Sequence, residues 1–276
     1  MEDFLVCIFM KLSLDELILS VPLVCKSWRE ASLDTLCWRV LDFQELDIMS
    51  WHRFAKRVAA QYPLSRLSFS AFLKFAVRRS RGLAVELRFP MFLRASMEDL
   101  VFVSNECPRL NILVLGSMGL EDRDHISELA GKWTELEHLE MAANPSTFPE
   151  LASEINLHCR NFSGLKMAGL RMKDAMAIVN HLPNLKYLNL SNSYISKGTL
   201  LLMMNGCKEI EVLTVKHCVG FEADGEVREA AARIGVFNHE GSKLTNDSDS
   251  DSDDCVASCR FFHDREDYRM GRRCLL

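Results

Sequence analysis

A repeating apolar pattern runs through the middle of the chain. The pattern Leu-x-x-Leu-x-Leu at 110–115 recurs in altered form, in copies that begin at Leu136, Phe162, Leu185 and Ile210. These beginnings are 26, 26, 23 and 25 residues apart, and 85–87 carries a degenerate earlier copy. Alternation of apolar with other residues over a few positions predicts a half-buried strand. Each copy therefore predicts one short strand, repeated at a nearly constant interval.

Helical patterns fill the intervals between these strands, for example at 97–106, 124–132, 148–158, 173–181 and 199–205. A strand and a helix at this period are typical of leucine-rich repeats, in which stacked units bury a shared ladder of leucines. The predicted fold class is α/β. Five or six repeats are expected to form a curved solenoid, with a parallel sheet on its concave face and helices on its convex face. Three cysteines in phase with the repeats are then expected in the core, at Cys107, Cys159 and Cys207.

A different pattern precedes the repeats. The first apolar stripe at helical spacing consists of Leu5, Ile8, Phe9 and Leu12. Ser13 is a predicted N-cap for a second short helix, and Pro22 can begin a third helix with Val24, Cys25 and Trp28 on one side. Helices this short bury their own apolar faces poorly. The segment is therefore either a docking module or the capping end of the following domain, and composition leaves both open.

The motif itself resembles a known family. Ile8-Phe9-x-x-Leu12, Leu17, Leu23-Val24-Cys25-Lys26-x-Trp28-Arg29 and Trp38 resemble an F-box over residues 2 to about 43. F-box proteins recruit a Skp-type adaptor and, through it, a cullin ubiquitin ligase. The resemblance implies adaptor-binding residues at Leu5, Ile8, Phe9, Leu12, Leu17, Val24, Cys25 and Trp28. The repeats, with their cysteines at helix ends, are similar to those of plant F-box proteins with cysteine-containing repeats.

One feature of the family motif is absent. The Leu-Pro pair that normally opens it does not stand before Glu2-Asp3. The resemblance therefore predicts a substrate-recognition subunit, but it leaves an alternative. A protein with an N-terminally shortened F-box would be an interaction scaffold without ligase function.

The predicted organisation has four parts. An F-box-like helical domain covers 1–43, a helical connector 44–81, the repeats 82–240 and a disordered acidic tail 241–276. In the connector, Ser50 and Ser70 are predicted helix caps. In the tail, the run 246–254 is acidic. Ser248 and Ser250 each precede an acidic residue by three positions, which makes them candidate phosphorylation sites. The alternative is that the run is a simple solubilising linker.

Strand alternation sends the side chains between the leucines to the concave face. Concave faces of solenoids are where partners usually bind. The predicted target-binding residues are Glu86, Arg88, His138, Glu140, Lys166, Tyr187, Asn189 and Lys216. An ordinary solvated sheet is the alternative for any one of them. The mixture is neither strongly charged nor rich in aromatic residues, which favours a protein target of unknown identity over nucleic acid.

Composition excludes several classes of protein. The net charge of −5 has a local source in the tail, so the body gives no argument for nucleic acid or an anionic membrane. No run approaches the ~18 apolar residues of a membrane span. Ten scattered cysteines without a secretory signal favour a reducing compartment, the nucleus and/or the cytoplasm.

No catalytic motif rises above chance. The chain has no phosphate loop, no His-Glu-x-x-His and no Gly-x-Ser-x-Gly. Cys255, Cys259 and His263 provide three ligands in no standard spacing, so no metal site is predicted. The sequence thus predicts a non-catalytic protein without a cofactor. A cysteine-dependent enzyme is a weaker third class.

Overall fold

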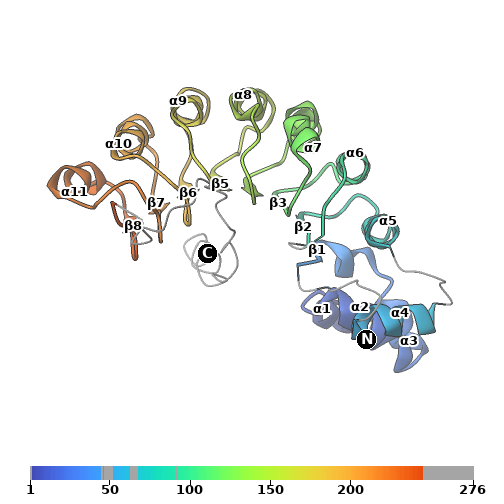
Figure 1. Ribbon diagram of the computed structural model, residues 1–276. Helices are drawn as coiled ribbons and strands as arrows, with labels where there is room; N and C mark the ends of the chain where they lie inside the picture. Colours follow the sequence, from blue (N-terminus) through green and yellow to red (C-terminus); the bar gives the residue numbers. More distant parts are fainter. Residues whose placement is uncertain (1, 45, 47–51, 63–67, 91–92, 245–276) are drawn as a thin grey trace.

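The repeats form one continuous parallel sheet. The computed structural model describes residues 2–44, 46, 52–62, 68–90 and 93–244. Eight strands within these residues follow one another in sequence order, from β1 at one end of an open arc to β8 at the other (Figure 1). Their bounds are Val40–Asp42, Glu86–Arg88, Ile112–Leu115, His138–Met141, Gly164–Met167, Tyr187–Asn189, Val212–Thr214 and Val236–Asn238.

A ladder of leucines fixes the register of the sheet. Leu41 pairs with Leu87, and Leu113 continues the row on the next strand. The row then passes through Leu139, Leu165, Leu188 and Leu213 to Phe237. The seven leucines are almost completely buried. A slip of one residue would turn the whole row to solvent, so this apolar face specifies the pairing.

Helices cover the convex side of the sheet (Figure 1). They are α5 Phe69–Ser80, α6 Met97–Glu106, α7 Leu120–Asp124, the 3-10 helix η3 Ile126–Lys132, α8 Phe148–His158, α9 Met172–His181, α10 Lys197–Gly206 and α11 Gly225–Ala231. Ser96 caps α6 and Ser196 caps α10, each by accepting from a backbone N–H of the first turn. The predicted solenoid of strands and convex helices is confirmed.

The cysteines at the helix ends lie in the core, as predicted. Cys107, Cys159 and Cys207 follow directly after α6, α8 and α10 and are buried. Burial raises the pKa of Cys107 to about 12 and the pKa values of Cys159 and Cys207 to about 11. These thiols therefore stay protonated at neutral pH, where a nucleophile would need a thiolate.

A compact group of short helices precedes the sheet. Its elements are α1 Glu2–Phe9, α2 Leu14–Leu19, the 3-10 helix η1 Val21–Leu23, α3 Lys26–Ala31 and the 3-10 helix η2 Thr35–Trp38. Ser13 is the N-cap of α2, as predicted, and its backbone N–H donates to the Glu16 carboxylate at 3.0 Å. Pro22 begins only a 3-10 turn. Cys25, with extended backbone, precedes α3, so Cys25 and Trp28 do not share a helix with Val24.

The connector predicted at 44–81 is divided between its neighbours. Helix α4, Arg53–Gln61, packs on α2, where Arg57 donates to the Leu19 carbonyl and Gln61 to the Ile18 carbonyl. Those carbonyls lie at the end of α2, where helices leave acceptors unsatisfied. Helix α5 instead packs on α6 and serves as the first convex helix. Its cap is Ser68, not the predicted Ser70, while Ser50 lies outside the described residues.

The repeat array is longer than the predicted five or six copies. The predicted copies account for β2 to β7, and the sheet gains β1 and β8. Strand β1 lies inside residues 1–43, which were predicted to be only helical. Both strands are three residues long. Around β1 the repeat spacing is filled by Trp38, Leu41 and Phe43, and around β8 by Ile234, Phe237 and His239. Few of these are leucines, so pairing with β2 and β7 was needed to reveal the two strands.

The two regions share one core. Buried side chains form a single cluster that extends from Val6 to Ile234. Trp38 joins the halves: its indole N–H donates to the Ser32 carbonyl at 2.9 Å, and its ring meets Phe75 of α5 edge to face. Arg79 of α5 lies over the same indole, 5.5 Å from its centre. The helical group is therefore packed rigidly onto the first repeat.

Candidate interaction surfaces

The short helices expose large apolar side chains. Phe4 and Leu23 are 69% and 66% exposed, Val24 is 58% exposed, and Ile8 and Met10 are exposed to a smaller degree. They lie on α1, on the residue that follows it and on the turn between α2 and α3. Large apolar side chains left exposed on so short a segment make it a candidate binding surface.

The predicted adaptor-binding set is only partly on this surface. Ile8, Val24 and Cys25 are exposed. Leu5, Leu12 and Trp28 are partly buried against the core. The prediction that Phe9 and Leu17 form part of the exposed binding surface is corrected, because both side chains are buried. The Phe9 ring meets the Trp28 ring edge to face, with centroids 5.2 Å apart, so it holds α1 onto α3. Motif residues of this kind build the domain and do not reach a partner directly.

The predicted adaptor-binding set missed the exposed residues Phe4, Met10 and Leu23, and also Leu33 and Leu36 further along the helical group. Phe4 and Ile8 are four residues apart, so a second apolar stripe on α1 was visible beside the stripe of Phe9. The sequence does not say which stripe faces the core. In the structure Val6 and Phe9 face inward, which leaves Phe4 and Ile8 outside.

Four predicted target-binding residues form an ion network on the concave face. Arg88 lies 2.5 Å from Glu86 and 3.9 Å from Glu140, and Lys166 lies 3.4 Å from the other oxygen of Glu140. Glu86 and Glu140 are only 6% and 8% exposed. The expectation that these two carboxylates are presented to a target is therefore wrong, because their partners cover them.

Two other predicted residues form an aromatic pair. The rings of His138 and Tyr187 stack, with centroids 5.8 Å apart and planes 30° apart. Gly164 lies between them in the sheet register. A Cβ atom at Gly164 would overlap the His138 ring. Burial holds the pKa of His138 below its usual value, against the opposite influence of Glu140 and Glu86.

Of the last two predicted residues, Asn189 shares β6 with Tyr187 and Lys216 lies further along the arc. Asn189 accepts from the backbone N–H of Ser191 at 3.0 Å, which shapes the turn after β6. Lys216 follows β7, and its backbone N–H donates to the Ser191 hydroxyl. Both side chains are half-buried. The structure therefore gathers Glu86, Arg88, His138, Glu140, Lys166 and Tyr187 on β2 to β6 and leaves Lys216 outside that cluster.

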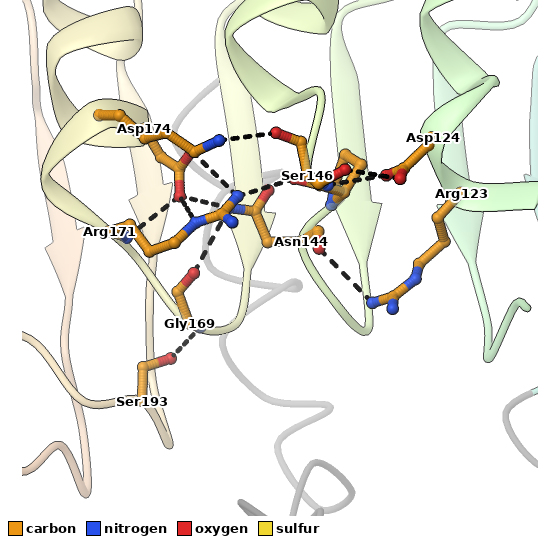
Figure 2. Close-up of polar contacts among 10 residues, drawn as sticks. Arg123, Asp124, Asn144, Ser146, Gly169, Arg171, Asp174 and Ser193 are labelled. Atoms are coloured by element: carbon orange, nitrogen blue, oxygen red, sulfur yellow. Dashed lines mark hydrogen bonds and ion pairs between the residues drawn. The ribbon is translucent and has the colours of Figure 1, made fainter. Parts of the chain in front are cut away.

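A polar seam joins successive turns where strands lead into helices (Figure 2). Asp174 is fully buried at the start of α9, where it accepts from Asn144 at 2.7 Å and from Arg171 at 2.8 Å. Ser146 bonds Asp124 of the preceding turn, and Ser193 accepts from the Gly169 N–H. Asn144 thus links neighbouring units. The seam has a structural role, since the buried Asp174 carboxylate is held by Asn144 and Arg171.

No group of three or more histidine, cysteine or acidic residues is arranged to hold a metal ion anywhere in the described parts of the chain. Within those same residues, no helix is both long and apolar enough to cross a membrane. The candidate phosphorylation sites Ser248 and Ser250, together with Cys255, Cys259 and His263, lie outside the described residues.

Comparison with known proteins gives consistent results. A family model described as F-box-like matches residues 2–44. An F-box/LRR-repeat protein of Arabidopsis thaliana is 31% identical, over 78% of this chain and 70% of that protein. The F-box protein FBW2 of the same plant is 27% identical, over 96% of this chain and 81% of that protein. A solved structure from Bacteroides fragilis is 13% identical, over 64% of this chain and 62% of that chain, and resembles this chain only weakly, with a TM-score of 0.46.

Proposed function

This chain belongs to the F-box/LRR-repeat proteins, and from that membership we propose that it is the substrate-recognition subunit of a Skp–cullin–F-box ubiquitin ligase. The short helices would bind a Skp-type adaptor and, through it, a cullin. The concave face of the repeats would bind the target protein. The chain would perform no chemistry itself, because ubiquitin transfer would be accelerated by holding the target near the ligase.

The exposed apolar surface of the helical group carries this proposal. Phe4, Ile8, Leu23 and Val24 cost free energy while they face water. Complete burial of such a side chain is worth roughly 1.5–3 kcal/mol. An adaptor that covers several of them recovers part of this free energy at each one, which offsets part of the entropy lost on association. Cys25 beside Val24 would be covered at the same time.

The shared core supports the second half of the proposal. Trp38, Phe75 and Arg79 pack the helical group against the first repeat. A target on the concave face would therefore stay at a fixed distance and direction from the adaptor. Fixed geometry of this kind is what catalysis by proximity requires.

One binding measurement tests the proposal. We expect the purified full chain to bind a purified Skp-type adaptor in calorimetry. The double variant Leu23→Asp with Val24→Asp should weaken binding by at least about tenfold, which is 1.4 kcal/mol. Both residues are exposed, so the variant should stay folded. Trp28→Ala is a poor test because Trp28 packs on Phe9.

Leu120→Asp is the matched control, since Leu120 is an equally exposed leucine on the convex helix α7. Binding by this variant should equal that of the wild type. If the folded wild-type chain does not bind the adaptor, the ligase assignment is wrong, and an interaction scaffold without ligase function takes its place. Equal loss in both variants would show that binding does not use the helical group.

A further inference from the structure

We propose that the outer edge of β8 binds residues 255–263 of this same chain, which add a ninth strand and close the open end of the solenoid. Residues 245–276 follow Leu244 and lie outside the described residues. The inference does not depend on the proposed function. It replaces, for this one segment, the expectation that the tail is disordered.

Strand β8 has an open edge. Within the described residues it is the last strand of the sheet, at one end of the arc (Figure 1). The Val236 N–H and the Asn238 carbonyl form hydrogen bonds toward β7. Successive residues of a strand direct their backbone groups to opposite edges, so those of Phe237 and His239 point away from β7. Such a row of backbone groups is a template for a further strand.

The last step of the leucine ladder is incompletely covered. Leu213 of β7 is 0% exposed, whereas Phe237, which pairs with it, is only half-buried. Val236 beside it is 47% exposed. The terminal unit of a solenoid has one side without a neighbour, and a capping unit normally covers that side. Strand β8 therefore offers apolar surface as well as backbone groups to an additional strand.

The repeat spacing continues beyond β8. Phe237 follows Leu213 by 24 residues, and Phe261 follows Phe237 by the same 24. The sequence Phe237-x-His239 also recurs as Phe261-x-His263. A parallel neighbour requires a crossover of a dozen residues or more. The connection from β8 to a strand at Phe261 has the length that already joins β7 to β8.

A cysteine marks the same phase. Cys107, Cys159 and Cys207 each precede by six residues the ladder leucine of the following strand, and they occur in every second repeat. Cys255 precedes Phe261 by six residues and is the next member of this series. The three earlier cysteines are buried. The series therefore assigns Cys255 to the equivalent buried position beside the ninth strand.

The helical part of this unit departs from the pattern. Val227 of α11 is buried, and the residue 24 positions later is Asp251, in the acidic run. Ser258 likewise stands where the preceding unit has the buried Ile234. The unit therefore supplies a strand but no apolar helix face. A polar outer side is what a terminal unit requires, because it has no further neighbour to cover it.

The chain's own segment is favoured over a second copy of the chain. The segment is tethered to β8, and a short flexible tether gives an effective concentration in the millimolar range. A second copy would also lose translational and rotational freedom on binding. At micromolar protein concentration the tethered segment therefore occupies the edge first.

Amide hydrogen exchange of the full chain, followed by NMR, tests the inference. The Phe237 and His239 amides, which face the outer edge, should be protected in the wild type. In Phe261→Asp they should exchange at least tenfold faster, because a carboxylate at the ladder position releases the segment. Phe262→Asp is the matched control, since alternation turns Phe262 away from the core, and it should keep protection within threefold of the wild type.

Unprotected Phe237 and His239 amides in the wild type, or equal effects of the two aspartate variants, would overturn the inference. Protection that rises with protein concentration would also overturn it, because a second copy would then cover the edge. A chain that elutes as a monomer while both amides stay protected supports the tethered segment.

The native thiols give an independent measurement. Cys255 should react with a maleimide at least tenfold more slowly than Cys259, because Cys259 corresponds to the exposed Gly235 at the beginning of β8. Phe261→Asp should remove this difference. Equal rates in the wild type contradict the assigned position of Cys255. A difference that persists in Phe261→Asp contradicts it as well, because the neighbouring charges alone would then cause it.

Discussion

The short helices and the repeats differ in how completely they bury their apolar side chains. In the repeats, strands and helices are covered by neighbouring repeats, so the leucine ladder is closed, and Arg88 and Lys166 lie beside Glu140 on the concave face. The helical group has no such neighbour on its outer side, and it leaves Phe4, Leu23 and Val24 in water. Under the proposed function, the helical group would associate by burying this apolar area, whereas the repeats have already buried theirs.

Thiol chemistry should show the largest contrast between the two regions. Cys7 and Cys25 on the helical group are exposed, whereas Cys37, where that group meets α5, and Cys107, Cys159, Cys207 and Cys218 in the repeats are buried. Burial also raises the pKa of each repeat thiol. Labelling by a maleimide should be at least ~10³-fold slower in the repeats, because it requires opening against a large share of the folding free energy. Mass spectrometry of timed samples measures each site.

A repeat cysteine that reacts as fast as Cys7 would contradict this closed-core description. It would also revive a cysteine-dependent activity, which the raised pKa values disfavour.

Two leucines compare the regions directly. Leu113 in the ladder is 0% exposed and Leu23 is 66% exposed. Leu113→Ala should lower the free energy of unfolding by about 2–5 kcal/mol, since it removes buried contacts and leaves a cavity. Leu23→Ala should change it by less than about 0.5 kcal/mol. Urea denaturation followed by circular dichroism gives both numbers, and similar losses would mean that Leu23 belongs to the core.

The polar seam should contribute a smaller amount. Asp174→Ala removes the shared acceptor of Asn144 and Arg171, and we expect a loss of about 1–3 kcal/mol in unfolding free energy. Arg171 is half exposed and can regain water, which limits the cost. Glu150→Ala, an exposed carboxylate in the first turn of α8, is the control and should cost less than about 0.5 kcal/mol. Equal losses of unfolding free energy in the two variants, measured by denaturant melts, would contradict a structural role for the polar seam.

The pH dependence of stability should show the smallest effect. Burial lowers the pKa of His138 in the folded state, so the unfolded chain binds this proton more readily. The stability due to the neutral ring is full above the unfolded value near 6.5 and is lost as the pH falls through the folded pKa. His138→Gln should therefore flatten the fall in stability below pH 7.

His125 provides the opposite sign. Its exposed imidazole contacts Glu128, which raises its pKa, so its contribution is present at low pH and declines as the pH rises. Thermal melts of His138→Gln and His125→Gln between pH 5 and 8 should differ in the sign of their pH slope relative to the wild type. The same sign in both would contradict the assigned environments.

Individual residues show how much of the structure could be predicted from the sequence. The period of Leu110, Leu136 and Phe162 was enough to predict the solenoid, and strand alternation correctly placed His138 and Tyr187 on the concave face. The F-box resemblance correctly located the helical group. However, the motif did not separate Phe9, which builds the core, from Ile8, which faces solvent.

The sequence by itself determined the repeating strand, its period and the residues that alternate with the leucines, because these depend on local spacing along the chain. Only the tertiary structure decided which residues are available. It paired Glu140 with Arg88 and Lys166, brought His138 to Tyr187 across Gly164, and turned one stripe of α1 inward. Those outcomes depend on contacts between residues more than twenty positions apart and on the packing of neighbouring helices, which no local pattern encodes.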